Sequence, residues 1–170
     1  QIVLALTFLA LIPSFLKAQE YVSTEPQNRN VLIEEFTGRN CGYCPDGHRI
    51  ANEIMANNPG RVWAVNIHAG SFSPISYPNM NTTDGTTITN GFNISGFPAG
   101  HVNRSTTVDI PRNLWNQYTN TQLSQSAEVN VAGFVTLDHA TRTAEITVEV
   151  YYTANSAQST NYLTVMMLQD

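Results

Sequence analysis

Two cysteines, three positions apart, are the residues of this chain whose types and spacing point most directly to chemistry. Cys41 and Cys44 are the only cysteines among the 170 residues, and they lie in the stretch NVLIEEFTGRNCGYCPDGHRIANEI, residues 30–54. A C-x-x-C pair can be half of a metal site, a short structural disulfide or a redox centre. Each interpretation makes a different demand on the rest of the sequence.

A purely structural disulfide explains little here. Closing a loop of four residues removes only about 2 kcal/mol of conformational free energy from the unfolded chain. Small domains that depend on disulfides use several of them, whereas this chain has a single possible pair.

A metal site needs further ligands. Structural zinc takes four, commonly from two C-x-x-C pairs or from one pair and two histidines. No second cysteine pair exists, and the four histidines are scattered, at His48, His68, His101 and His139. Because His48 follows Cys44 by one helical turn, copper or zinc held by both thiolates, His48 and another histidine remains an alternative.

A redox centre requires a particular arrangement of secondary structure around the cysteines. We expect a strand over 31–36, and apolar residues at helical spacing predict a helix over 44–57 that ends at Pro59-Gly60. A second strand is expected over 61–68, so the two strands should be parallel and joined by a right-handed crossover. The helix amino end would favour a Cys41 thiolate as nucleophile, with Cys44 one turn inside as the resolving thiol.

Further elements follow a long polar connection, residues 69–85, which we interpret as a lid or an insertion. A short helix is expected within 86–94 and a strand from about Ala99. Residues 109–125 read as a helix with Asp109 as its N-cap and Pro111 in its first turn. Its apolar face would consist of Ile110, Leu114, Trp115 and Tyr118.

From about residue 126 the pattern changes to alternating strands. These are expected over 127–137, 143–153 and 161–169, with no helix between them. The pattern predicts an antiparallel meander that opens with a hairpin and begins a β-sandwich.

The amino-terminal residues and the charge indicate where the protein works. Residues 2–16 form an almost continuous apolar run, which predicts an incomplete secretory signal peptide over 1–18, with Ala18 before the cleavage site. An uncleaved anchor is the alternative. The net charge is −5 and basic residues do not cluster, so we expect no nucleic-acid partner.

Two stretches resemble the thioredoxin superfamily. VLIEEFTGRNCGYCP, residues 31–45, is similar to its active-site strand, loop and helix, and GFNISGFPAGHVN, residues 91–103, is similar to its helix, G-hydrophobic-Pro and strand. The resemblance implies that Pro98 is cis beside the cysteines, that the backbone of Phe97 pairs with substrate, and that Glu35 is the buried acid that assists proton transfer. Asn40 replaces the usual Trp, and Gly-Tyr replaces Gly-Pro between the cysteines.

More narrowly, the chain resembles the exported outer-membrane-protein-28-related family of Gram-negative bacteria. The resemblance implies an α/β thioredoxin-like domain (a mixed sheet with flanking helices) over 30–125, after a linker over 19–29. A truncated, all-β, immunoglobulin-like sandwich domain would follow over 126–170. It also implies export to the periplasm, the outer membrane or the cell surface.

The sequence therefore favours an exported thiol–disulfide oxidoreductase with protein or peptide thiols as substrates. Cys41 would attack and Cys44 resolve, so no cofactor is expected beyond their redox-active disulfide. Tyr43, Phe97 and Pro98 would contact substrate, and His68, at a carboxyl strand end, would tune Cys41. Partners would be a periplasmic or membrane redox protein, with possible outer-membrane association. The rival is a non-catalytic binding, assembly or adhesion module whose C-x-x-C stays oxidised.

Overall fold

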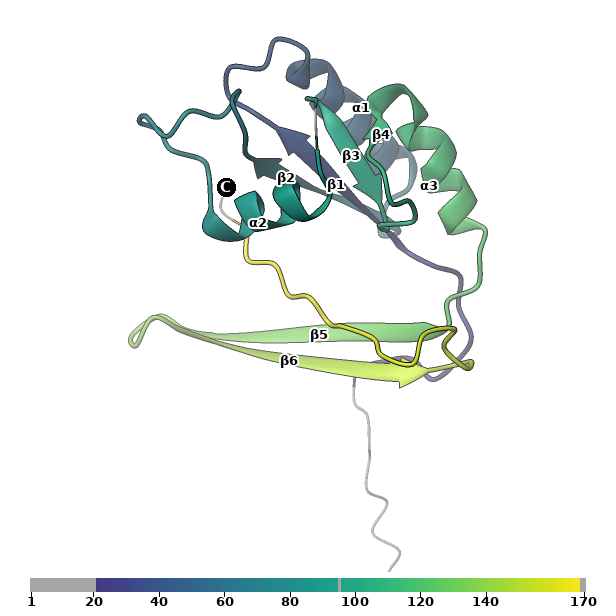
Figure 1. The fold of residues 1–170 in the computed structure, drawn as a ribbon. Helices are drawn as coiled ribbons and strands as arrows, with labels where there is room; N and C mark the ends of the chain where they lie inside the picture. The colour runs from purple at the N-terminus through teal and green to yellow at the C-terminus, as the bar shows by residue number, and fades with distance from the viewer. Residues whose placement is uncertain (1–20, 95, 169–170) are drawn as a thin grey trace, which may run out of the picture.

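The computed structural model describes residues 21–94 and 96–168, so the predicted signal peptide over 1–18 lies outside the described residues. The described residues form two sheets, a four-stranded sheet in the order β2-β1-β3-β4 and a two-stranded sheet of β5 and β6 (Figure 1). The elements are β1 (Val31–Thr37), α1 (Cys44–Asn57), β2 (Val62–His68), α2 (Thr83–Gly91), β3 (Ala99–Val102), β4 (Ile110–Pro111), a 3-10 turn (Arg112–Leu114), α3 (Trp115–Leu123), β5 (Val129–Asp138) and β6 (Thr143–Tyr152).

The predicted strand–helix–strand unit is confirmed. β1 and β2 pair in parallel, from Val31 opposite Val62 to Thr37 opposite His68, and α1 connects them. Both strands end at the same edge of the sheet, and the cysteine loop leaves β1 there. This edge is where open α/β sheets place their functional sites.

The second half of the sheet corrects one prediction. Asp109 is not a helix cap: Ile110 and Pro111 form β4, which pairs with Gly100 and Ala99 of β3, and α3 begins only at Trp115. Pairing with β3 keeps Pro111 extended, with ψ at 144°, so the helix cannot start there. The predicted apolar face still packs inward, since Ile110 and Trp115 are buried and Leu114 and Tyr118 pack beside them.

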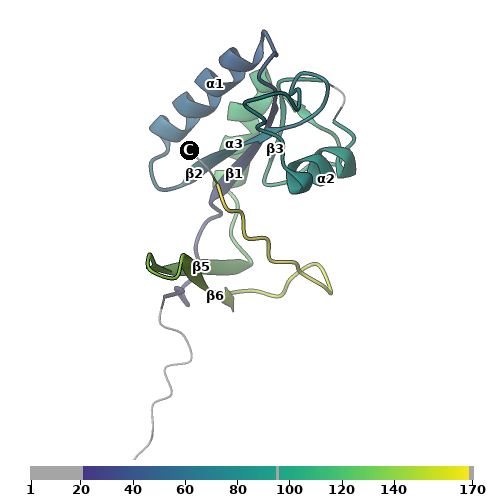
Figure 2. The ribbon, with the colours of Figure 1, turned by 90° about the vertical axis from the view of Figure 1, so that its left-hand side faces the viewer.

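The two faces of the four-stranded sheet carry separate apolar clusters. On one face, residues of β1 such as Ile33 pack with Ala51 and Ile54 of α1 and with Trp115 of α3. On the other, Phe36, Val65 and Ile67 form a cluster against which Ile88 of α2 packs. Figure 2 shows α1 and α2 on opposite sides of the sheet. Alternate residues of β1 therefore face different surroundings.

The predicted hairpin is confirmed by β5 and β6, which pair along their whole length from Val129 opposite Tyr152 to Asp138 opposite Thr143. The third predicted strand is wrong, because residues 161–168 form no ladder with any described strand. This segment instead runs back toward α2 (Figure 1), and Met166 packs against the cluster of Phe36, Val65 and Ile67. The immunoglobulin-like sandwich remains a prediction.

No helix among residues 21–94 and 96–168 has the length and apolar character that a membrane span requires.

Candidate functional site

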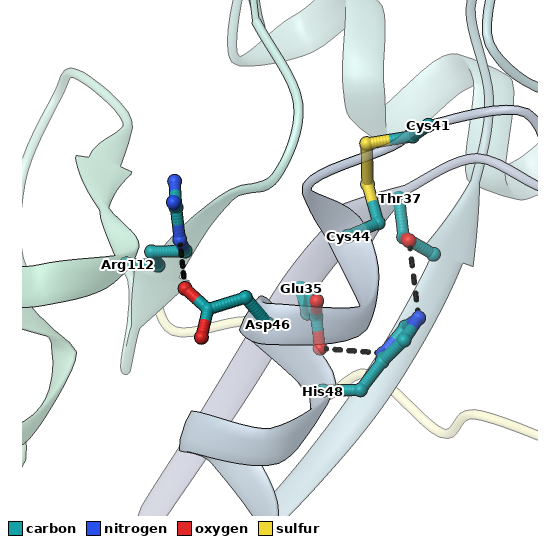
Figure 3. Close-up of a disulfide and its surroundings, with 7 residues drawn as sticks. All are labelled: Glu35, Thr37, Cys41, Cys44, Asp46, His48 and Arg112. Carbon is teal, nitrogen blue, oxygen red and sulfur yellow. Dashed lines mark hydrogen bonds and ion pairs between the residues drawn. A yellow bond between two sulfur atoms is a disulfide. The ribbon is translucent and has the colours of Figure 1, made fainter.

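Cys41 and Cys44 form a disulfide at the amino end of α1 (Figure 3). Cys44 is the first residue of the helix and Pro45 occupies its first turn, where a missing N–H leaves no hydrogen bond unmade. Cys41 lies in the loop before the helix and is 7% exposed, whereas Cys44 is 1% exposed. The outer cysteine is thus the more accessible of the two, as the redox interpretation requires.

Pro98 packs against the helix turn that follows the disulfide. The Phe97–Pro98 peptide bond is cis. A Cβ placed on Gly47 would lie 3.0 Å from Pro98 Cβ, so a glycine at position 47 allows the proline loop to approach α1 this closely. The structure therefore brings Pro98 to the helix that carries Cys44.

The long connection before α2 is attached to the cysteine loop. The Asn40 amide donates to the Phe72 carbonyl over 2.8 Å, and Arg39 donates to Ser76 Oγ over 2.9 Å and to the Pro78 carbonyl over 3.0 Å. The Phe72 ring meets the Phe97 ring edge-on at 5.9 Å. The segment of residues 72–78 therefore lies beside the cysteine loop.

Tyr43, the other predicted substrate contact, projects from the dipeptide between the cysteines. It is 71% exposed, and the Arg112 guanidinium lies 5.5 Å from the centre of its ring. Arg112 also donates to Asp46 of α1 over 2.7 Å, which ties the start of α3 to the helix of the cysteines.

Glu35 lies in β1 beneath α1 and has no solvent-exposed surface (Figure 3). Its Oε2 is 3.1 Å from His48 Nδ1. Its Oε1 is buried and has no hydrogen-bond partner among the described residues. Burial raises the pKa of Glu35 to about 7, although the charge and hydrogen bond of His48 act in the opposite direction.

His48 is a site residue whose role the sequence reasoning missed. Its Nδ1 faces Glu35, and its Nε2 is 3.4 Å from Thr37 Oγ1. Two features of the sequence point to this role. The first is that Glu35 and Thr37 share one face of a strand, while His48 lies one turn beyond Cys44 on the inward face of the helix. The second is that Gly47, in the interior of that helix, marks the close approach of another element.

His68 ends β2, opposite Thr37. Burial first, and then the His48 charge, lower its pKa, and its Nδ1 is buried without a hydrogen-bond partner among the described residues. His68 therefore lies in the electrostatic range of His48, while its effect on Cys41 stays a prediction.

Within residues 21–94 and 96–168, no three His, Cys, Asp or Glu side chains are grouped so that they could hold a metal ion. His48 is engaged by Glu35 and Thr37, and both sulfurs are in the disulfide.

The fold and the site together define a thioredoxin-like module with a disulfide in C-x-x-C spacing. Among solved structures the chain is similar to HBP35 of Porphyromonas gingivalis, with a TM-score of 0.50 and 21% sequence identity. The similarity covers 65% of this chain and 38% of that one, so this chain matches well under half of that neighbour's length. At this identity the comparison shows a thioredoxin-like fold and nothing finer. No protein-family model and no curated protein matches the chain.

Proposed function

We propose that this chain is a thiol–disulfide oxidoreductase that acts on protein thiols through Cys41 and Cys44. One observation carries the proposal: the disulfide lies at the amino end of α1, with Pro98 packed on the same helix and the buried Glu35 beneath it. A disulfide that served only as a brace would require neither the proline nor the buried acid.

The chemistry needs no cofactor beyond the disulfide. A substrate thiolate attacks Cys41 Sγ, the Cys41–Cys44 bond breaks, and Cys44 leaves as a thiolate that takes up a proton. A second substrate thiolate then attacks the substrate sulfur of the mixed disulfide and releases Cys41 as a thiolate. The substrate loses two electrons and the cysteine pair gains them. The reverse sequence reduces a substrate disulfide. The dipole of α1, whose amino end lies at the disulfide, favours the Cys41 thiolate in either direction.

The substrate would be an extended protein segment. Pro98 and the Phe97 backbone would hold it beside Cys41, and Tyr43 would contact its side chains. Exposed aromatic side chains in the segment of residues 72–78 support this assignment, since Phe72 is 43% exposed and Tyr77 is 96% exposed. His68 would tune Cys41 through the charges of the site.

We further propose that the protein is exported, to the periplasm, outer membrane or cell surface, as a member of the outer-membrane-protein-28-related family. A periplasmic or membrane redox protein would reset the cysteine pair. The β5–β6 hairpin would open an immunoglobulin-like sandwich. Its exposed apolar side chains, including Phe134 and Leu137, support the prediction that more strands cover it.

A second candidate is a binding or assembly module whose disulfide is permanently oxidised. The observation that favours it is the low exposure of Cys41, because attack on a disulfide requires access to the outer sulfur.

Trapping separates the two candidates. Cys44→Ser should accumulate a mixed disulfide with a fluorescent peptide disulfide, since no resolving thiol remains, whereas Cys41→Ser should accumulate far less. Gel mobility under non-reducing conditions measures both. If wild-type protein stays oxidised in a dithiol buffer and Cys44→Ser traps no peptide, the oxidoreductase proposal fails and the binding module stands.

A further inference from the structure

A cleft of about 540 Å³ opens between the four-stranded sheet and the β5–β6 hairpin. It lies at the end of the sheet away from the disulfide, because β2 runs from Trp63 in the cleft wall to His68, opposite Thr37 where the cysteine loop leaves β1. Figure 2 shows the hairpin at the end of the sheet away from the loop that enters α1. Sites for small organic ligands have volumes of about 300–1,000 Å³ and often lie between domains. The cleft therefore has the size of a ligand site that the cysteine chemistry does not use.

We propose that this cleft, called the amide cleft below, binds a neutral carbohydrate. Trp63 packs against the face of a sugar ring, and side-chain amides form hydrogen bonds with its hydroxyl groups. The site is separate from the cysteine pair and does not depend on the proposed thiol chemistry.

Trp63 is the large apolar side chain in the wall of the amide cleft. It precedes Val65 and Ile67 on the same face of β2, but it is 49% exposed whereas they are buried. Its indole N–H has no hydrogen-bond partner among the described residues. A sugar ring has a face of C–H groups, which packs on the flat surface of an indole, and a rim of hydroxyl groups that reach polar neighbours. Trp63 is therefore suited to hold one sugar ring.

Side-chain amides make up much of the remaining wall. They belong to Gln27, Asn28, Asn30, Asn103 and Asn130. An amide both donates and accepts hydrogen bonds, and so does a hydroxyl group, so the two match in either direction. Gln27 and Asn28 are exposed, and their side chains have no hydrogen-bond partner in the described part of the chain. These two amides are therefore available to a ligand.

Two other amides fix the walls of the cleft. Asn103 Oδ1 accepts from the Leu32 amide over 2.8 Å, and its Nδ2 donates to the Asn30 carbonyl over 2.8 Å. On the hairpin side, Asn130 is buried and donates to the Ser23 carbonyl over 2.7 Å. A wall held by such hydrogen bonds does not have to become ordered when a ligand binds, which lowers the cost of binding. The cleft is therefore preformed.

The charged side chains of the wall, Arg29 and Glu128, indicate a neutral ligand. Arg29 donates to Gln122 Oε1 over 3.2 Å and to the Ser126 carbonyl over 3.3 Å. Glu128 Oε2 accepts from the Ala157 amide over 3.3 Å. The two charges have opposite signs and both side chains are engaged, so the wall favours neither an anion nor a cation. A neutral molecule rich in hydroxyl groups matches the amides and the indole together.

The two tryptophans of the chain permit a direct test, because Trp115 is fully buried and Trp63 is half exposed. Acrylamide quenches the fluorescence of exposed indoles only. Cellobiose, maltose or N,N′-diacetylchitobiose should reduce this quenching, with a dissociation constant on the order of 1 mM for at least one of them. Glucuronic acid, which is charged, should protect far less. Protection by none of the three neutral sugars, or equal protection by glucuronic acid, would overturn the proposal.

Substitutions in the cleft test its residues, with binding of the protective sugar measured by saturation-transfer NMR. Trp63→Ala should weaken binding about tenfold, whereas Trp63→Phe, which keeps a ring, should weaken it by no more than about threefold. Asn28→Ala should weaken binding about fivefold through the loss of hydrogen bonds, and it decides the matter if Trp63→Ala does not fold. Asn52→Ala is the matched control, since Asn52 is an exposed amide of α1 outside the cleft, and it should bind as wild type does. Wild-type binding by both Trp63→Ala and Asn28→Ala would overturn the proposal.

Two further measurements separate the cleft from the cysteine site. Cys44→Ser should bind the sugar as wild type does, and Trp63→Ala should exchange disulfides at the wild-type rate. Loss of sugar binding in Cys44→Ser would overturn the proposal of a separate site. Protection of Trp63 by an apolar peptide and by no sugar would assign the cleft to a protein segment and overturn the carbohydrate assignment.

Discussion

Two neighbouring glutamates of β1 are both buried, and they face opposite sides of the same sheet. Glu34 is 1% exposed and Glu35 is 0% exposed. Arg104 binds both oxygens of Glu34, through Nε at 2.7 Å and Nη2 at 2.5 Å. Glu35 has one oxygen on His48 and the other without a partner in the described part of the chain. Two adjacent acids thus have very different partners.

The difference separates a structural carboxylate from a reactive one. Bidentate pairing with an arginine, which does not titrate in the working range, stabilises the charge of Glu34. The hydrogen bond to Glu34 in turn raises the pKa of Arg104, whose guanidinium also lies 5.2 Å from the centre of the Phe92 ring. Glu35 instead faces an imidazole on one oxygen only, and burial raises its own pKa to about 7. Its charge can therefore change when the cysteines react.

Arg104→Met should have the largest effect on folding. It leaves the Glu34 carboxylate buried and unpaired, which costs about 3–5 kcal/mol of unfolding free energy. Urea denaturation at pH 7 measures the loss. Arg49→Met is the matched control, because Arg49 pairs with Asp46 and Glu53 on the exposed face of α1, where solvent screens the pairs and their loss should change stability far less. Equal losses in the two variants would contradict a structural role for Glu34.

Glu35→Gln should change how stability depends on pH. Between pH 4.5 and about 7 the unfolded chain releases the Glu35 proton while the folded protein keeps it, so stability falls as pH rises through this window. The difference between the two pKa values corresponds to about 3 kcal/mol. Urea denaturation at pH 4, 5.5 and 8 should show this fall in wild type and a correspondingly smaller one in Glu35→Gln. Parallel curves would mean that Glu35 is not a buried, proton-holding acid.

Gly47→Ala should have an intermediate effect on both stability and exchange. The new methyl group would meet Glu35 Oε1 at 2.5 Å and Pro98 Cβ at 3.0 Å, and overpacking of this kind costs about 1–3 kcal/mol. Gly91→Ala is the control, since nothing lies within 4 Å of a Cβ at the end of α2. Thermal denaturation of both variants, followed by circular dichroism, checks the prediction. A neutral Gly47→Ala would contradict the tight packing of helix, proline and acid.

Thr37→Val should have the smallest effect. It removes one hydrogen bond to His48 while keeping the shape of the buried side chain, so the loss is about 1 kcal/mol or less. The exchange rate at pH 6 should fall by no more than about fivefold, which is the same energy expressed as a rate. A loss as large as that of Glu35→Gln would place Thr37 in the proton path itself.

Sequence patterns predicted the elements that depend on local periodicity and missed those that depend on distant pairing. The helix over 44–57 was predicted with its observed bounds, because its apolar spacing and Pro59-Gly60 are local signals. The predicted start of α3 was wrong because the pairing of β4 with β3 overrides the helical signal of Asp109 and Pro111. The strand over 161–169 was wrong for a related reason, since no described strand pairs with it.

The residues of the candidate site also separate into those that local sequence motifs predict and those that depend on distant packing. The cysteines and Pro98 belong to motifs that are short in sequence, and the structure places them together. In the pair Glu34-Glu35, sequence alone does not say which acid faces the cysteine helix. Nor does it show that His48 rather than a metal completes the site. Both facts depend on how α1 packs over β1, which joins residues 13 positions apart.

The reduction potential of the Cys41–Cys44 pair tests the central claim most directly. Equilibration of purified protein with glutathione buffers, followed by mass spectrometry of alkylated thiols, measures it. A protein that exchanges disulfides with other proteins should have a potential between about −120 and −270 mV. A potential below about −300 mV, with no exchange in glutathione, would mean a permanent structural disulfide and would contradict the oxidoreductase account.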